Sequence, residues 1–158
     1  SNGRDLRGKN VTAPRLLLPT PGAPFTVVAS AMSAEPDRPH IGGFVLWKDE
    51  LHYITLIVGG HGEGDIVLAE HRDFKERPVG RGYLAADRIT IRLDVHDGEV
   101  EALCSVGGDA WLAVGRTAFD AEHAQVGLVA IGSIDRTVYP GIFPDGAAIR
   151  FEDIQVWE

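Results

Sequence analysis

The sequence predicts an all-β protein: an antiparallel two-sheet sandwich made by one domain. Two observations predict it. Apolar and polar residues alternate along most apolar segments, and short turns rich in glycine, aspartate and proline separate these segments. Within residues 88–95, alternate positions hold Ile89, Ile91, Leu93 and Val95. This period of two places one face against a core and the other face in solvent, which is typical of a half-buried antiparallel strand.

A hairpin follows this strand. Asp97-Gly98 is a strong signal for a tight turn, and residues 100–106 then return as the partner strand. Residues 107–109 make the next turn, and another strand begins at residue 110. In all, about ten strands are expected, a spacing that suits a sandwich or a barrel. They cover residues 14–18, 25–33, 41–47, 51–58, 65–72, 88–95, 100–106, 110–114, 125–132 and 149–157.

Two further segments stand apart from the strands. Residues 118–124 are the best candidate for a helical turn, although no segment has a convincing amphipathic helix pattern. Residues 133–146 form a long loop, and long loops on a rigid β scaffold often hold ligands.

The chain has 158 residues, of which 44% are hydrophobic and 24% are charged. These values fit one globular domain with a real core. We expect residues 1–10 to be a tag remnant or a flexible N-terminal segment, and residues 11–158 to form a single jelly-roll domain.

The net charge is −8, from 15 basic and 23 acidic residues. An acidic protein is poorly suited to nonspecific binding of nucleic acid or an anionic membrane, so neither partner is expected. Cys104 is the only cysteine, which excludes an internal disulfide, and its alternating context favours a buried, inert thiol. One cysteine does not define the compartment, so the location stays open, including an extracellular or cell-surface one as part of a larger protein.

Three blocks of sequence carry a resemblance to known proteins. The first is residues 13–19 with Gly22 and residues 25–28. The second is residues 42–56, an aliphatic strand, Trp47, an acidic turn, Tyr53 and a second aliphatic strand. The third is residues 91–93 with Gly98 and residues 105–111, and residues 125–128 resemble the strand that follows it.

These blocks resemble the concanavalin A-like lectin/glucanase superfamily. The chain is most similar to a jelly-roll family of unknown function whose fungal members are described as enolase regulators, and also to the β-sandwich appended to family 43 glycoside hydrolases. The shared motifs are structural, so the resemblance implies the fold more than the function. Residue 107 is glycine where the pattern usually has aspartate.

Glycoside hydrolysis needs two carboxylates set across the sugar bond. Jelly-roll glucanases carry them along one strand, as Glu-x-Asp-x-Glu or a close variant. Here only Glu99-Val100-Glu101 is present, and Glu99 lies at a turn. We therefore expect no catalytic residues, and a hydrolase is the least favoured function.

Sugar binding needs aromatic rings that stack on C–H faces and planar polar groups that reach hydroxyls. By alternation, Tyr53 and Arg92 point away from the core, and Arg92 should lie near Leu103 or Glu101, so a shallow polar groove is one interpretation. The alternative is a cross-strand ion pair between Arg92 and Glu101, with the tryptophans in the core. The candidate ligand-binding residues are Trp47, Tyr53, His71, Arg92, Glu101 and Tyr139.

The sequence offers no transition-metal site, because its six histidines form no His-x-His or His-x-x-x-His pair. Many lectins of the resembled superfamily carry calcium, and residues 62–65 and 49–50 place oxygen ligands on loops. Neither segment has the spacing of a calcium-binding loop. We expect no cofactor, with calcium as the alternative.

The function expected from these observations is a non-catalytic carbohydrate-recognition or accessory domain that belongs to a larger protein. Its partners would be an oligo- or polysaccharide and a neighbouring domain. The alternative is a protein-interaction or scaffold module without a sugar ligand, which a large exposed apolar patch would favour.

Overall fold

The computed structural model describes residues 3–158 and confirms the predicted all-β, two-sheet fold. Within these residues the chain forms strands and turns only, so no helix is present that could cross a membrane. The strands are β1 (Leu6–Arg7), β2 (Asn10–Val11), β3 (Arg15–Pro19), β4 (Phe25–Ser33), β5 (Gly42–Asp49), β6 (His52–Val58), β7 (Asp65–Arg72), β8 (Lys75–Tyr83), β9 (Arg88–His96), β10 (Glu99–Ser105), β11 (Leu112–Ala118), β12 (Gln125–Ala130) and β13 (Ile149–Trp157).

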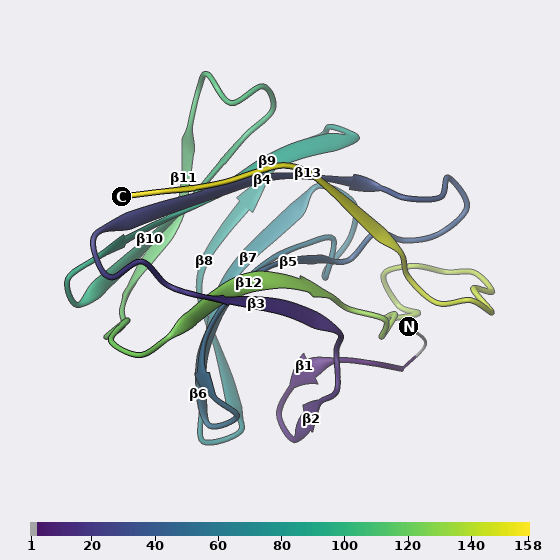
Figure 1. The fold of residues 1–158 in the computed structure, drawn as a ribbon. Coiled ribbons are helices and arrows are strands. Elements are labelled where there is room, and N and C mark those ends of the chain that lie inside the picture. Colours follow the sequence, from purple (N-terminus) through teal and green to yellow (C-terminus); the bar gives the residue numbers. More distant parts are fainter. Residues whose placement is uncertain (1–2) are drawn as a thin grey trace.

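Eleven of these strands form one strongly curled antiparallel sheet, in the order β13-β4-β9-β10-β11-β8-β7-β6-β5-β12-β3. The sheet folds over on itself into two layers (Figure 1). The β4 half is the set of strands β13, β4, β9, β10 and β11. The β3 half is the set of strands β8, β7, β6, β5, β12 and β3. The halves are joined where β11 meets β8, and Gly115 opposite Gly80 is the only paired position there among the described residues.

The main core lies between the two halves. Alternate residues of each strand point into it, as the period of two predicts. Its largest buried side chains include Phe44, Leu46, Ile54, Leu56, Ile66, Leu68, Ile89, Ile91 and Leu93. Cys104 is buried in the same core, and burial raises the pKa of its thiol, so it is the unreactive group that the sequence predicts.

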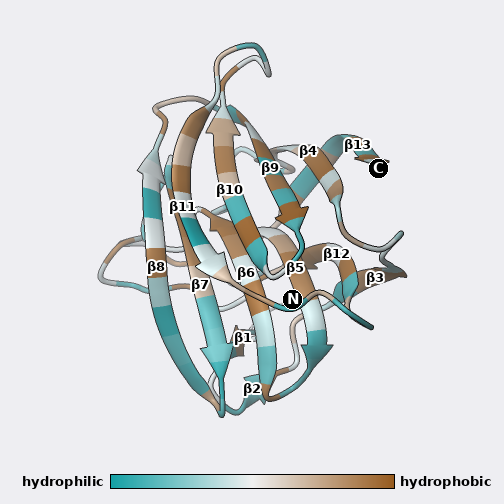
Figure 2. Cartoon of the chain, turned by 90° about the vertical axis from the view of Figure 1, so that its left-hand side faces the viewer, coloured by the Kyte–Doolittle hydropathy of each residue, from teal (hydrophilic) through white to brown (hydrophobic). Residues whose placement is uncertain are grey.

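The β9–β10 hairpin forms as expected. Glu99 pairs with His96 across the turn, and Gly98 has a φ of 79°, a conformation that glycine adopts without strain. Arg92 lies opposite Leu103, one of its two expected neighbours. Residues along β9 alternate between apolar and polar (Figure 2).

A second core covers the outer face of the β3 half. The short β1–β2 hairpin lies on this face, on the side away from the β4 half (Figure 1), and side chains of segment 131–147 pack into the same core. Strands β5, β6 and β7 are therefore buried on both faces, which accounts for their nearly continuous apolar sequences. The buried members of the second core are Leu6, Ala13, Ile41, Val45, Trp47, Tyr53, Val129, Ile131, Tyr139 and Ala147.

The structure adds one long strand that the alternation does not reveal. Strand β8 is mostly exposed, and its residues are largely polar or glycine (Figure 2). The strand has little apolar periodicity, so it is recognised from its pairing with β7 and not from its composition. The expected helical turn at residues 118–124 is wrong: the segment ends β11 and makes a tight turn at residues 122–123.

Substitution of Gly80 by alanine should destabilise the protein by roughly 2 kcal/mol or more, because it overpacks the junction of the two halves. An added Cβ would lie 2.3 Å from the Val114 carbonyl oxygen and 2.6 Å from the Gly115 Cα. Urea unfolding measures the change. The matched control is Gly107→Ala, at an exposed turn where the nearest atom to an added Cβ is 4.0 Å away, and its effect should stay within about 0.5 kcal/mol. Equal effects of the two substitutions would contradict the close-approach argument.

Candidate functional site

A cavity of about 290 Å³ lies on the outer face of the β3 half, beneath the β1–β2 hairpin and the start of segment 131–147. Buried residues line it, including Leu6, Ile41, Val67 and Ala69, and exposed residues stand at its mouth. Its volume is near the lower end of ordinary small-molecule sites. The polar lining residues are Asp5, Arg7, Thr55, His61, His71, Glu76, Ser133 and Asp135.

Pairing of β6 with β7 builds the floor of this cavity. Thr55 lies opposite Ala69, and Ile57 lies opposite Val67. The residues between them in the sequence, such as Leu56 and Leu68, point into the main core. Alternation therefore directs every second residue of both strands toward the cavity.

Three rings lie in a row beside the cavity. The Trp47 and Tyr53 rings have centroids 4.9 Å apart, and Tyr53 stacks on His71 with centroids 4.3 Å apart and an interplanar angle of 10°. The Arg15 guanidinium lies 4.3 Å from the Trp47 ring centroid at the far end. Relative exposures of 9% for Trp47 and 1% for Tyr53 show that the overlying segments cover these rings.

His71 is the most unusual polar group in the cavity. Its side chain is 3% exposed, and its Nε2 lies 2.9 Å from the Thr55 hydroxyl. Its Nδ1 is buried without a hydrogen-bond partner, the only such side-chain atom in the described part of the chain. Burial, with a smaller contribution from Arg7, lowers the pKa of His71 to about 4. The imidazole is therefore neutral at pH 7.

Charged side chains surround the mouth. Arg7 Nε lies 2.6 Å from a Glu76 carboxylate oxygen and ties the β1–β2 hairpin to β8. Asp5 accepts a hydrogen bond from the Leu6 backbone N–H at 2.7 Å, and Asp135 accepts one from the Thr137 backbone N–H at 2.8 Å. Acidic groups outnumber basic ones here, so the mouth favours neutral or cationic ligands over anions.

Four of the six predicted ligand residues lie in this layer. Trp47, Tyr53 and His71 form the ring row, and His71 lines the cavity. Tyr139 is buried in the second core, where its hydroxyl donates to the Gly59 carbonyl oxygen at 2.5 Å. Burial raises the pKa of both Tyr53 and Tyr139 to about 12. Both phenols are therefore neutral at physiological pH.

The other two predicted residues, Arg92 and Glu101, lie on the β4 half. Arg92 Nε is 2.8 Å from Asp94, and its guanidinium lies 5.4 Å from the Trp111 ring centroid. Glu101 pairs instead with Arg116, at 3.2 Å. The expected Arg92–Glu101 ion pair is not formed. A groove shared with Tyr53 is not formed either, because Tyr53 lies on the outer face of the opposite half.

Sequence reasoning missed several polar groups of the cavity. Asp5 and Arg7 fall in the segment expected to be a tag remnant or flexible, where the described residues instead pair and pack on the sheet. Glu76 lies on β8, which was not expected to be a strand. The alternation of β6 places Thr55 on the same face as Tyr53. This was the one signal in the sequence that pointed to a missed residue of the cavity.

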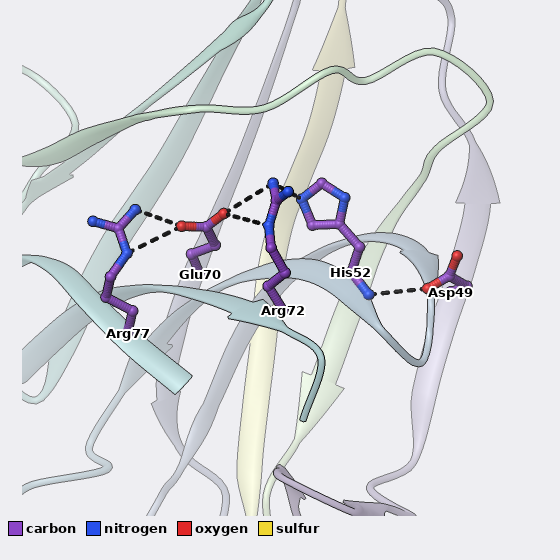
Figure 3. Close-up of polar contacts among 5 residues, drawn as sticks. All are labelled: Asp49, His52, Glu70, Arg72 and Arg77. Carbon is purple, nitrogen blue, oxygen red and sulfur yellow. Dashed lines mark hydrogen bonds and ion pairs between the residues drawn. The ribbon is translucent and has the colours of Figure 1, made fainter. Parts of the chain in front are cut away.

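A separate polar cluster lies at one end of the β3 half (Figure 3). Glu70 is almost buried and is held by Arg77 at 2.5 Å and Arg72 at 3.2 Å. Arg72 Nη2 is also 3.1 Å from His52 Nε2, and the His52 backbone N–H donates to Asp49. The hydrogen bond from Arg77 lowers the pKa of Glu70. Because each charge has a partner, the cluster serves the fold rather than a ligand.

The structure gathers no cluster of three or more histidine, cysteine, aspartate or glutamate side chains suited to a metal ion within residues 3–158. The loop acids at residues 49–50 and 62–65, considered above as calcium ligands, are therefore not part of such a cluster.

No family model matches the sequence, and no curated protein matches it. Solved structures do match its fold. The GH43 protein BlXynB from Bacillus licheniformis superposes with a TM-score of 0.69 at 14% identity, covering 92% of this chain and 32% of that one. A functionally unknown protein from Saccharomyces cerevisiae gives a TM-score of 0.68 at 15% identity, covering 96% and 80%.

The carbohydrate binding module CBM66 from Bacillus subtilis gives a TM-score of 0.59 at 10% identity, covering 87% of this chain and 76% of that one. These similarities confirm the β-sandwich fold, which is consistent with the concanavalin A-like jelly roll that the sequence resembles. The chain spans about a third of the length of the GH43 protein.

Replacement of His71 by asparagine should flatten the pH dependence of stability between pH 6.5 and pH 4. The pKa of His71 falls from 6.5 to about 4 on folding, so the unfolded chain binds the proton more readily in this interval. The free energy of unfolding therefore decreases as the pH falls, by about 3 kcal/mol at pH 4 and below.

Urea unfolding of both proteins at a series of pH values measures this difference. The matched control is His61→Asn at the exposed mouth of the same cavity, which should keep the slope of the unmodified protein. If the free energy of unfolding varies with pH in the same way for the unmodified protein and the His71 variant, the burial of His71 is contradicted.

Proposed function

We propose that this domain is a non-catalytic carbohydrate-recognition or accessory module, and that the cavity on the outer face of the β3 half is its ligand site. The observation that carries the proposal is the cavity itself, a hollow lined by polar and apolar residues in about equal share, whose floor presents a buried imidazole and a hydroxyl. In small-molecule sites, polar groups held at fixed positions beside apolar ones select and orient a ligand.

The similar structures support this proposal through fold analogy. One of them is a carbohydrate binding module, and another is a GH43 protein in which a sandwich of this kind makes up about a third of the chain. On this analogy the domain accompanies a catalytic domain of a longer protein and brings it to an oligo- or polysaccharide.

The carboxylates around the cavity support a binding function rather than hydrolysis. A glycosidase needs an acid whose pKa is raised so that it can donate a proton. Hydrogen bonds from Thr137 instead lower the pKa of Asp135. Glu76 is paired with Arg7, and Asp5 accepts from the backbone. Each acid therefore already serves the local structure as an acceptor.

Substitution of Ser133 by phenylalanine should abolish glycan binding, because Ser133 lines the cavity and a large ring there would fill the cavity. Its side chain is half-buried, and its backbone N–H, which donates to Arg4, remains in place. Calorimetry and thermal shifts with plant and microbial oligo- and polysaccharides, with and without calcium, measure binding.

The control is Arg92→Ala on the outer face of the β4 half. It should bind like the unmodified protein and lose no more than about 1 kcal/mol of stability, as expected for a partly exposed ion pair. If Arg92→Ala loses glycan binding while Ser133→Phe retains it, the ligand site lies instead on the outer face of the β4 half. Absence of binding by the unmodified protein to every glycan would contradict the proposed function.

A second function, a scaffold or protein-interaction module, is favoured by the two free edges of the sheet. Leu16 and Leu18 on β3 are 63% and 54% exposed, and Val156 and Trp157 on β13 are also exposed. Val156 lies opposite the core residue Val27, so it extends the inner face at the open side of the sandwich. Exposed apolar side chains at an unpaired edge are typical of docking surfaces.

A further inference from the structure

A paired arginine and glutamate stand at the mouth of the cavity and come from two distant parts of the chain. Arg7 belongs to the β1–β2 hairpin, and its Nε lies 2.6 Å from Glu76 Oε2 on β8. Both residues line the cavity. Glu76 lies opposite His71 in the β7–β8 pairing, and residues paired across two strands share a face of the sheet. The pair therefore stands on the outer face of the β3 half, at the edge of the cavity.

Both side chains of the pair are in contact with solvent. The Arg7 side chain is 56% exposed and the Glu76 side chain 22%. The charge of Arg7 also acts on groups of the sheet and of segment 131–147. It adds to the burial that lowers the pKa of His71. It likewise adds to the hydrogen bonds from Thr137 that lower the pKa of Asp135. A ligand at the mouth therefore has access to the pair.

The pair keeps hydrogen-bonding groups that the fold does not use. Within residues 3–158, neither Arg7 nor Glu76 has a further hydrogen bond or ion pair. The Nη atoms of Arg7 remain donors, and the Oε1 of Glu76 remains an acceptor. Because the ion pair holds the two side chains together, a donor and an acceptor stand next to each other at the mouth.

An adjacent donor and acceptor match a neutral polyol. One hydroxyl can accept a hydrogen bond from Arg7 while its neighbour on a sugar ring donates one to Glu76. A carboxylate only accepts, so it would leave Glu76 without a donor and would be repelled by its charge. An ammonium group only donates, so it would leave Arg7 without an acceptor. The pair therefore favours two neighbouring hydroxyls over a charged group.

Another ion pair on β8 differs from this one and provides a matched comparison. Arg81 Nε and Nη2 donate to the two carboxylate oxygens of Asp65 at 2.7 and 3.1 Å. The Arg81 side chain is 64% exposed, close to the value for Arg7. Neither Arg81 nor Asp65 belongs to the cavity lining. Asp65 is thus occupied through both oxygens, whereas Glu76 is occupied through one.

We propose that Arg7 and Glu76 are the specificity-determining pair of this cavity and bind a neutral sugar through two neighbouring hydroxyls. The Nη atoms of Arg7 donate to one hydroxyl, and Glu76 Oε1 accepts from the other. This inference rests on the proposed carbohydrate-binding function, and it assigns the class of sugar and the residues that bind it.

The first test compares neutral sugars with the uronates that share their ring hydroxyls. Isothermal titration calorimetry of the intact domain with D-glucose, D-galactose, D-glucuronate and D-galacturonate, and with D-xylose and L-arabinose, measures the dissociation constants. At least one neutral sugar should bind. Each neutral hexose that binds should do so about tenfold more tightly than its uronate. Tighter binding of the uronates would overturn the assigned class of sugar.

The second test alters each member of the pair. Arg7→Lys keeps the charge but loses the planar fork, so it should weaken binding of the neutral sugar about tenfold. Glu76→Gln leaves Arg7 as an unpaired cation, so the preference for a neutral hexose over its uronate should decrease or reverse. The matched control is Arg81→Lys, which alters an ion pair of similar exposure on β8. It should bind like the unmodified protein.

Monodeoxy analogues of the sugar that binds separate contact from scaffolding. One analogue should bind the unmodified protein about tenfold more weakly and lose nothing further with Arg7→Lys, because both changes remove the same hydrogen bond. If Arg7 only holds the hairpin in place, its substitution should weaken the parent sugar and every analogue by the same factor. Additive losses for all analogues would therefore overturn the assigned contact.

The outcomes distinguish this inference from the proposed function. If a glycan binds Arg7→Lys and Glu76→Gln as it binds the unmodified protein, the role of the pair is overturned while the carbohydrate-binding function stands. If calorimetry detects no glycan binding to the unmodified protein, the proposed function fails, and this inference fails with it.

Discussion

The burial of β5, β6 and β7 on both faces is the constraint on which the rest of this structure depends. One face packs into the main core, and the other needs a cover that the sheet itself does not provide. The β1–β2 hairpin and segment 131–147 supply that cover through buried apolar side chains such as Leu6 and Ile131. These two short segments do not cover the surface completely. The cavity lies where this cover is incomplete.

The same cover determines which side chains this face exposes. Trp47 and Tyr53 would offer stacking platforms to a glycan on an open sheet, yet here they pack beneath the protein's own hairpin. The face thus presents a recess lined by polar and apolar residues instead of open aromatic rings. His71 lies at the end of the ring row and at the wall of the recess, so the stack that buries it also holds its orientation.

Much of the fold could be predicted from the sequence, because a strand buried on one face leaves a period of two, as in residues 88–95. Strand β8 lacked this signal, since its side chains face mainly solvent and its place is set by β7. The site was less accessible to prediction. Tyr53 and His71 could be selected by residue type, but Arg92 lies on the other half of the sandwich, a relation that depends on how the sheet curls. Arg7 could not be placed from its local sequence, because its role comes from a contact with Glu76, far away in the chain.

The two covering segments come from opposite ends of the chain, residues 3–13 and 131–147. The recess is therefore the product of contacts between residues more than a hundred positions apart, such as the hydrogen bond from the Gly132 backbone N–H to the Arg4 carbonyl oxygen. Contacts of such long sequence separation carry a large loop-closure entropy and tend to form late in folding. A growing chain would complete the β5–β6–β7 meander well before its last third exists. The recess is thus a feature that the domain can present only after residues 131–147 have been added.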